Sequence, residues 1–134
     1  MAIFDAGKAC VFSAVEGVLT LNGEPVKGAT IMRKVEWQRE DSDATVTDEK
    51  GYFRFPAMYH RSVMKLFPAE FVASQDIIAI VDGKEYFLWH TTKREPGENA
   101  ELQGTQLNFK CELSNEPRFD HSYDASIETI CTWK

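Results

Sequence analysis

The sequence predicts an all-β protein, an antiparallel β-sandwich of about seven to eight strands. Three observations lead to this prediction. Short segments alternate apolar and polar residues with a period of two, which is typical of strands with one buried face. Asn22-Gly23 and Asp82-Gly83 follow such segments, and these pairs suit tight hairpin turns. No long amphipathic helix pattern interrupts the series, so consecutive strands have short connections.

Three segments in the first half of the chain are predicted strands: residues 15–21, 29–38 and 52–55. The long middle segment places Ile31, Val35 and Trp37 on one face. The charged residues 39–43 predict a loop. Residues 48–51 predict a turn, because the segment begins with Asp and ends with Gly.

Four segments in the second half are predicted strands: residues 77–81, 84–93, 105–113 and 127–133. The first of these is a continuous apolar run rich in β-branched residues, which indicates a central buried strand. The polar residues 94–104 and 114–126 predict two long loops. Residues 59–71 predict a loop with a short helix or strand, because Pro68 limits any helix.

Length and charge restrict the classes of protein and partner. A chain of 134 residues fits one domain, residues 1–134, which is long enough to bury a core without metal or disulfide support. The formal net charge of -6 disfavours nucleic acid and favours a partner with a basic protein surface. No apolar run approaches the roughly 18 residues of a membrane-spanning helix, so no membrane span is predicted.

Two features of the sequence bear on the cellular compartment of the protein: the start of the chain and the cysteines. The first residues have neither a basic opening nor a continuous apolar stretch, so the predicted compartment is the cytoplasm. The periplasm is the alternative if a leader has been removed. Cys111 and Cys131 lie in strand-like apolar segments and can be neighbours on adjacent strands. They form a disulfide in an oxidising compartment or serve as two small buried apolar residues, and the sequence leaves both interpretations open.

Turn glycines, prolines and apolar residues recur at defined spacings through the first half of the chain. They are Val15, Gly17, Asn22, Gly23, Pro25, Val26, Gly28, Ala29, Ile31, Thr45, Thr47, Asp48, Gly51, Phe53, Phe55 and Pro56. Over about residues 13–57 this pattern resembles the carboxypeptidase regulatory-like domain, a transthyretin-like (prealbumin-like) β-sandwich. The resemblance implies a fold and no particular chemistry, since that family is a structural and binding module.

The rest of the chain is similar to a small bacterial family of unknown function whose members are mostly single-domain proteins. Residues 10–29, 86–89, 111–113 and 130–133 carry this similarity. The resemblance implies a stand-alone protein encoded beside genes for secreted toxins, such as those of type VI secretion.

No residue pattern favours an enzyme. The transthyretin-like group includes 5-hydroxyisourate hydrolase, but this chain lacks the N-terminal histidine and the Tyr-Arg-Gly-Ser ending of that enzyme. His60 is expected on a surface loop, His90 half-buried in a strand, and His121 in an acidic loop, and none has a metal-binding spacing. Cys10 has no adjacent histidine to activate a thiol. The prediction is therefore no catalytic residue, no metal and no cofactor.

The remaining candidate is a protein-binding surface. Trp37 precedes a charged tract, and an aromatic residue beside acidic side chains suits a basic partner. The predicted partner-binding residues are Trp37, Arg39, Glu40, Asp41 and Asp43. The predicted function is a non-enzymatic binding module, an inhibitor or immunity protein that neutralises a secreted bacterial toxin. A carbohydrate- or envelope-binding accessory module is the alternative, and a small hydrolase is the third candidate.

Overall fold

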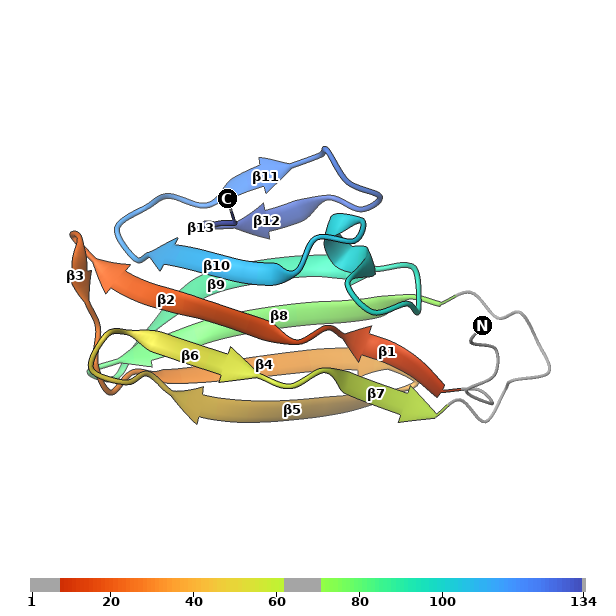
Figure 1. Cartoon of the computed structure of the whole chain (residues 1–134), viewed down its shortest axis with the longest axis horizontal. Helices are drawn as coiled ribbons and strands as arrows, with labels where there is room; N and C mark the ends of the chain where they lie inside the picture. The colour runs from red at the N-terminus through yellow and green to blue at the C-terminus, as the bar shows by residue number, and fades with distance from the viewer. Residues whose placement is uncertain (1–7, 62–70, 134) are drawn as a thin grey trace.

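The computed structural model describes residues 8–61 and 71–133, which form β-sheets in two facing layers (Figure 1). These residues contain no α-helix and one short 3-10 helix, η2 (Ala100–Leu102), so the all-β prediction is confirmed. Within the described residues, no helix is long and apolar enough to cross a membrane. Of the predicted loop at 59–71, residues 62–70 lie outside the described part of the chain.

The back layer in Figure 1 is a six-stranded antiparallel sheet. Its strands, in spatial order, are β11 (Arg118–Asp120), β12 (Ile127–Thr129), β9 (Lys84–Lys93), β8 (Ala73–Val81), β4 (Thr30–Trp37) and β5 (Arg39–Val46). A bulge in the β8–β9 pairing beside Ile77 lets Leu88 and Trp89 both point into the core, where each is at most 1% exposed. β8 is an interior strand, as predicted, although alternate residues of it reach solvent on the outer face.

The front layer consists of a five-stranded sheet and a two-stranded sheet. Its strands are β13 (Cys131–Thr132), β10 (Leu107–Glu112), β2 (Val15–Leu21), β3 (Glu24–Pro25) and β6 (Tyr52–Phe55), beside the pair β1 (Lys8–Phe12) and β7 (Met58–Arg61). β10 runs parallel to β2, whereas the sequence predicts a wholly antiparallel arrangement. The reason is the segment after β9, which crosses from the back layer to the front layer through η2 before β10 begins.

The thirteen strands of the described residues exceed the predicted seven to eight mainly because β1, β7 and β11 form where no strand is predicted, β5 replaces a predicted loop and one predicted strand is split. Residues 13–14 separate β1 from β2, and residues 56–57 separate β6 from β7. The last predicted strand breaks at Ile130, so that β12 belongs to the back layer and β13 to the front layer. The two predicted loops also contain structure: residues 94–104 include η2, and residues 114–126 include β11.

The core lies between the layers and is rich in aromatic residues. Trp89 stacks on Phe109 with ring centroids 4.9 Å apart, and half-buried Trp133 packs on both rings. Gly17 lets Phe53 and Phe109 pack closely against its strand, because a Cβ atom there would lie 2.9 Å from a ring carbon of Phe53 and 3.1 Å from the Cβ atom of Phe109. Asn22 and Gly23 adopt positive φ angles of 54° and 84°, as the predicted hairpin turn requires.

Candidate functional site

The predicted partner-binding residues lie at the tip of the β4–β5 hairpin and along its edge strand. The prediction that residues 39–43 form a loop is wrong, because they begin strand β5, which pairs with β4 along its whole length. The chain reverses at Gln38, whose φ angle of 67° is left-handed. Strand alternation then divides the charged tract between two faces of the sheet.

Trp37 faces the core side of this hairpin. Its ring is half-buried and lies 4.8 Å from the ring of Phe71. Most of the apolar surface of Trp37 is therefore used within the domain rather than presented to a partner.

Asp43 pairs with a fully buried arginine. The Arg33 side chain is 0% exposed, and its Nε and Nη2 donate to the two carboxylate oxygens of Asp43 at 2.9 and 2.6 Å. The guanidinium lies between the rings of Phe12 and Phe55, 4.9 and 4.6 Å from their centroids. It also donates to the Ser13 carbonyl oxygen. Because a buried cation needs a partner, Asp43 has a structural role here.

Asp41 pairs with a buried histidine. His60 lies on β7, 1% exposed, so its predicted position on a surface loop is wrong. Its Nε2 lies 3.1 Å from Asp41 Oδ2, and its buried Nδ1 has no hydrogen-bond partner within the part of the chain that the structure describes. The hydrogen bond from His60 lowers the pKa of Asp41 below its ordinary value. The alternation of β5 explains why Asp41 and Asp43 both point inward while Glu40 and Ser42 point to solvent.

Arg39 and Glu40 remain on the exposed surface of the hairpin. Glu40 lies directly across the strand pair from Glu36, which is exposed on β4. The Lys34 ammonium lies 3.7 Å from Glu40, at a pair in which both side chains are more than half exposed. Among the described residues Glu36 has no cationic partner at hydrogen-bonding distance. The outward face of this hairpin thus carries two acidic groups, of which only Glu40 has a cationic partner among the described residues.

One comparison with known proteins gives a match. The family model "Domain of unknown function (DUF6795)" matches residues 15–116. The chain belongs to the DUF6795 family. No curated protein matches the chain. The matched residues include the β4–β5 hairpin and Cys111, whereas Cys131 lies beyond them.

The DUF6795 chain also contains a buried polar cluster between its layers, which no pattern in the sequence predicts. The Glu101 carboxylate accepts from the Ser13 amide, the Ser13 hydroxyl and the Gln75 side-chain amide at 2.9, 2.6 and 2.8 Å. The Gln75 oxygen in turn accepts from the Trp89 indole at 3.0 Å. These hydrogen bonds hold the segment before β10 against both layers. No spacing of residues in the sequence indicates them.

Cys10 and Lys93 lie near the same cluster. Burial raises the pKa of the Cys10 thiol, so the thiolate is disfavoured there. Burial lowers the pKa of the Lys93 ammonium, which donates to the carbonyl oxygens of Glu95 and Gly97. Neither group has the exposed setting of a catalytic nucleophile.

Of the two remaining histidines, His90 lies on β9 of the back layer and His121 lies in the loop directly after β11. His90 is half-buried, as predicted, and its Nδ1 lies 2.9 Å from the Asp76 carboxylate on β8. His121 stacks on exposed Phe119, with ring centroids 6.2 Å apart. Within the described residues, no three His, Cys, Asp or Glu side chains gather as ligands for a metal ion.

Two open grooves lie outside the β4–β5 hairpin. The larger, of about 470 Å³, is bordered by Glu16, Arg54 and Glu98. The smaller, of about 380 Å³, lies beside Phe119 and His90 and is lined by hydroxyl and charged side chains. Neither groove contains a buried, unpartnered polar group that would mark a bound ligand.

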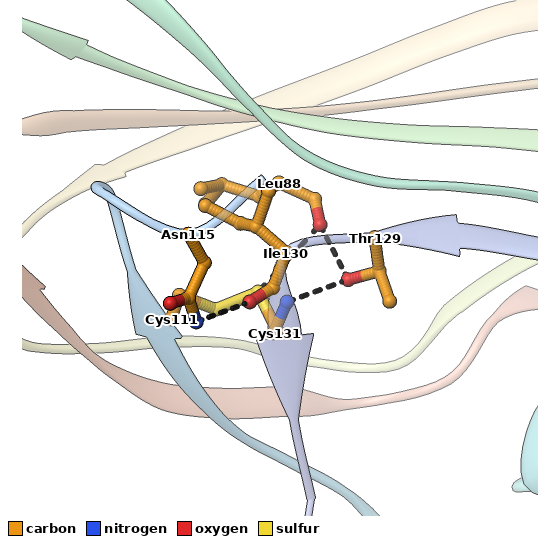
Figure 2. The surroundings of a disulfide bond; sticks show 6 residues. All are labelled: Leu88, Cys111, Asn115, Thr129, Ile130 and Cys131. Carbon is orange, nitrogen blue, oxygen red and sulfur yellow. Dashed lines mark hydrogen bonds between the residues drawn. A yellow bond between two sulfur atoms is a disulfide. The ribbon is translucent and has the colours of Figure 1, made fainter. Parts of the chain in front are cut away.

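Cys111 and Cys131 form a disulfide, with their Cα atoms 4.2 Å apart (Figure 2). They are direct cross-strand partners on β10 and β13. Beside them, Thr129 donates to the Leu88 carbonyl oxygen at 2.6 Å and accepts from the Cys131 amide at 2.9 Å. The disulfide therefore fixes the point at which the chain crosses from the back layer to the front layer.

Proposed function

We propose that this DUF6795 protein is a non-enzymatic protein-binding module that neutralises a secreted bacterial toxin, as an inhibitor or immunity protein. The observation that carries the proposal is the outward face of the β4–β5 hairpin, where exposed Glu36 and Glu40 lie directly opposite each other. Like charges at directly opposed positions destabilise a strand pair. Lys34 is close to Glu40 alone, so a cationic partner that compensates Glu36 would explain this exposed acidic pair.

The charge of the whole chain supports a basic partner. A net charge of -6 attracts a basic protein over distances limited by ionic screening and accelerates association. Arg39 and Glu40 contribute to this surface as exposed side chains. Asp41 and Asp43 contribute to its field, but their carboxylates are held by His60 and Arg33.

The transthyretin-like sandwich is part of the same proposal. The motif of residues 13–57 resembles the carboxypeptidase regulatory-like domain, and the two layers of Figure 1 are compatible with such a sandwich. The parallel β10–β2 pair is the feature to compare with the strand topology of transthyretin-like proteins. The resemblance to bacterial proteins encoded beside secreted-toxin genes supplies the class of partner.

The disulfide bears on the compartment. The sequence predicts the cytoplasm, where thiols are normally kept reduced. The Cys111–Cys131 bond supports the alternative, an oxidising compartment such as the periplasm. Alkylation of free thiols in denaturant, directly after lysis of the native host, distinguishes the two: one alkylated thiol, at buried Cys10, is expected in the periplasm, and three in the cytoplasm.

The test of function is isolation of the affinity-tagged chain from its native host, followed by measurement of binding to any purified partner. We expect a basic protein whose association slows as salt rises from 0.1 to 1 M, since the Debye length falls from about 10 to about 3 Å. Glu40→Lys is expected to lower the association rate. Recovery of no protein, or of a partner indifferent to salt and to Glu40→Lys, contradicts the proposal.

Carbohydrate binding is the second candidate, and the groove beside Phe119 is the observation in its favour. Phe119 is 63% exposed, and an exposed ring beside hydroxyl and charged side chains suits a sugar. A glycan array tests this candidate. Binding that disappears in Phe119→Ala and persists in Glu40→Lys would favour the accessory-module function over toxin neutralisation.

A further inference from the structure

We propose that the outer face of the six-stranded sheet, over β5, β4 and β8, is the docking surface for a protein that presents apolar side chains beside a lysine or arginine. This inference rests on the proposed function and names the surface and the chemistry of its partner. In Figure 1 this face is the side of the back layer turned away from the front layer. It is defined by alternation, because Ile31, Arg33 and Val35 of β4 are fully buried on the opposite side.

One end of this face is apolar. Met32 is 39% exposed and lies directly across from Ala44 on β5 and Ile78 on β8. One step along the strands, Val46 is 59% exposed and lies opposite Thr30, which pairs with Ile80 on the other side. These side chains form a contiguous uncharged patch across three strands, with Met32 at its centre. Contiguous exposed apolar surface of this kind marks interaction sites on soluble proteins.

The other end of the face is charged, with acidic groups in excess. Lys34 lies opposite Asp76, which lies opposite His90, which in turn lies opposite Glu128. In this row the basic and acidic groups alternate and partly neutralise one another. In the next row Glu40 lies opposite Glu36, and Glu36 lies opposite the uncharged Ser74. Lys34 also lies 3.7 Å from Glu40, so Glu36 is the acidic group of this pair that has no cationic partner among the described residues.

The spacing of the two ends specifies the partner. Glu36 lies four residues beyond Met32 on the same strand and the same face. A strand rises about 3.3 Å per residue, so the apolar centre and the acidic pair are roughly 13 Å apart. The partner must present an apolar group and a cation at that separation. A second copy of this chain is a poor occupant, because its matching face carries the same acidic pair and a net charge of the same sign.

The test uses two synthetic peptides of equal length and equal leucine content, one with lysines and one with glutamates between the leucines. Each is titrated into the isotopically labelled full chain and followed by amide chemical shifts. We expect the lysine peptide to shift the amides around Met32, Glu36, Ala44 and Ile78, and the glutamate peptide to leave them unchanged. Equal responses to both peptides, or shifts confined to the front layer, overturn the proposal.

Matched variants sharpen this test. Glu36→Lys should weaken binding of the lysine peptide at least about tenfold, because a repulsive charge replaces an attractive one. Glu24→Lys makes the same change on exposed β3 of the front layer and should leave binding within about twofold, since exposed charges beyond a Debye length are screened. Met32→Glu should abolish binding, and its amide spectrum away from β4 shows whether it is folded. If Met32→Glu does not fold, Met32→Ser replaces it, with the same expected direction.

A captured native partner separates this inference from the proposed function. Loss of that partner in Met32→Glu and Glu36→Lys supports both. A partner that binds these variants as tightly as the unmodified chain leaves protein binding established and overturns this surface. If no protein is captured, the proposed function fails, and the peptide titration alone decides whether the face has the inferred chemistry.

Discussion

The two faces of the β4–β5 hairpin present carboxylates in opposite situations. On the inner face Asp41 and Asp43 accept hydrogen bonds from His60 and Arg33, both almost completely buried. On the outer face Glu36 and Glu40 lie opposite each other in solvent. Lys34 forms an ion pair with Glu40, at 3.7 Å, and none with Glu36 among the described residues. The inner acids accept hydrogen bonds from buried donors, whereas Glu36 on the outer face has no cationic partner in the described part of the chain.

The difference shows that a charged tract in a sequence is not yet a charged patch. A loop would display all of residues 39–43 together, but a strand sends alternate side chains to opposite faces. Inward-pointing charges on an edge strand also discourage another chain from pairing with that edge. The same short tract therefore supports the fold on one side and leaves a surface for a partner on the other.

The largest effect is expected from breaking the inner pair at Asp43. Asp43→Ala leaves the Arg33 guanidinium buried without its counter-ion, which should lower the free energy of unfolding by about 3–5 kcal/mol. Urea denaturation measures this loss. Glu40→Ala on the same strand is the control and should stay within about 0.5 kcal/mol of the unmodified chain. A loss at Asp43 no larger than at Glu40 would mean that the inner acid is as dispensable as the outer one.

The disulfide between Cys111 and Cys131 contributes an unfolding free energy that does not depend on charge. Replacing Cys111 and Cys131 together with Ala opens a loop of sequence separation 20 and should cost about 2–4 kcal/mol of unfolding free energy. Unlike the contributions of Asp41 and of the outer acids, this loss should be the same at low and high salt and across mildly acidic pH. Chemical unfolding with and without a reducing agent measures it on the unmodified chain, and identical curves would contradict the prediction.

A smaller effect is expected at Asp41. Asp41→Ala removes the partner of His60 Nε2, and an unsatisfied buried group costs about 1–3 kcal/mol. Because the folded-state pKa of Asp41 is lowered, its contribution is present above the unfolded pKa of about 3.8 and is lost as pH falls through the folded value. Stability measured between pH 6 and pH 2 should therefore fall less steeply in Asp41→Ala than in the unmodified chain. Parallel curves would exclude this pH dependence.

The smallest effect, and the only expected gain, concerns the outer acids. Glu36→Gln removes one member of a like-charge pair and should raise the unfolding free energy by about 0.2–0.5 kcal/mol. The gain in unfolding free energy should disappear at 1 M salt, where the Debye length falls to about 3 Å. Thermal melts at low and high salt measure it, with Glu24→Gln as the matched change on another strand. Destabilisation by Glu36→Gln would show that the outer face, like the inner one, serves the fold.

Most strand positions could be predicted from the sequence because alternation and turn chemistry act locally. The predicted strands at residues 15–21 and 84–93 coincide with β2 and β9, and the turns at 22–23 and 82–83 adopt the expected backbone. The charged tract at 39–43 was mispredicted because its polarity outweighed its alternation, and pairing with β4 overrides local propensity.

Contacts between distant segments could not be predicted. The Ser13–Glu101 hydrogen bonds join residues 88 positions apart, and the parallel β10–β2 pair depends on a crossing between layers. The adjacent Arg61 predicts a surface position for His60, whereas in the fold His60 is buried and pairs with Asp41 of the distant strand β5. The candidate binding face also depends on register, which brings Glu36 opposite Glu40.

The position of the disulfide has a mechanical consequence. If the chain is pulled by its two ends, tension passes from β10 directly to β13 through the bond between Cys111 and Cys131. The segment 112–130, with β11 and β12, then carries no load. An extended chain spans up to about 3.3–3.6 Å per residue, so the 20-residue separation withholds roughly 70 Å of extension. In a single-molecule pulling trace the oxidised protein would unravel to a length shorter by that amount than the reduced protein.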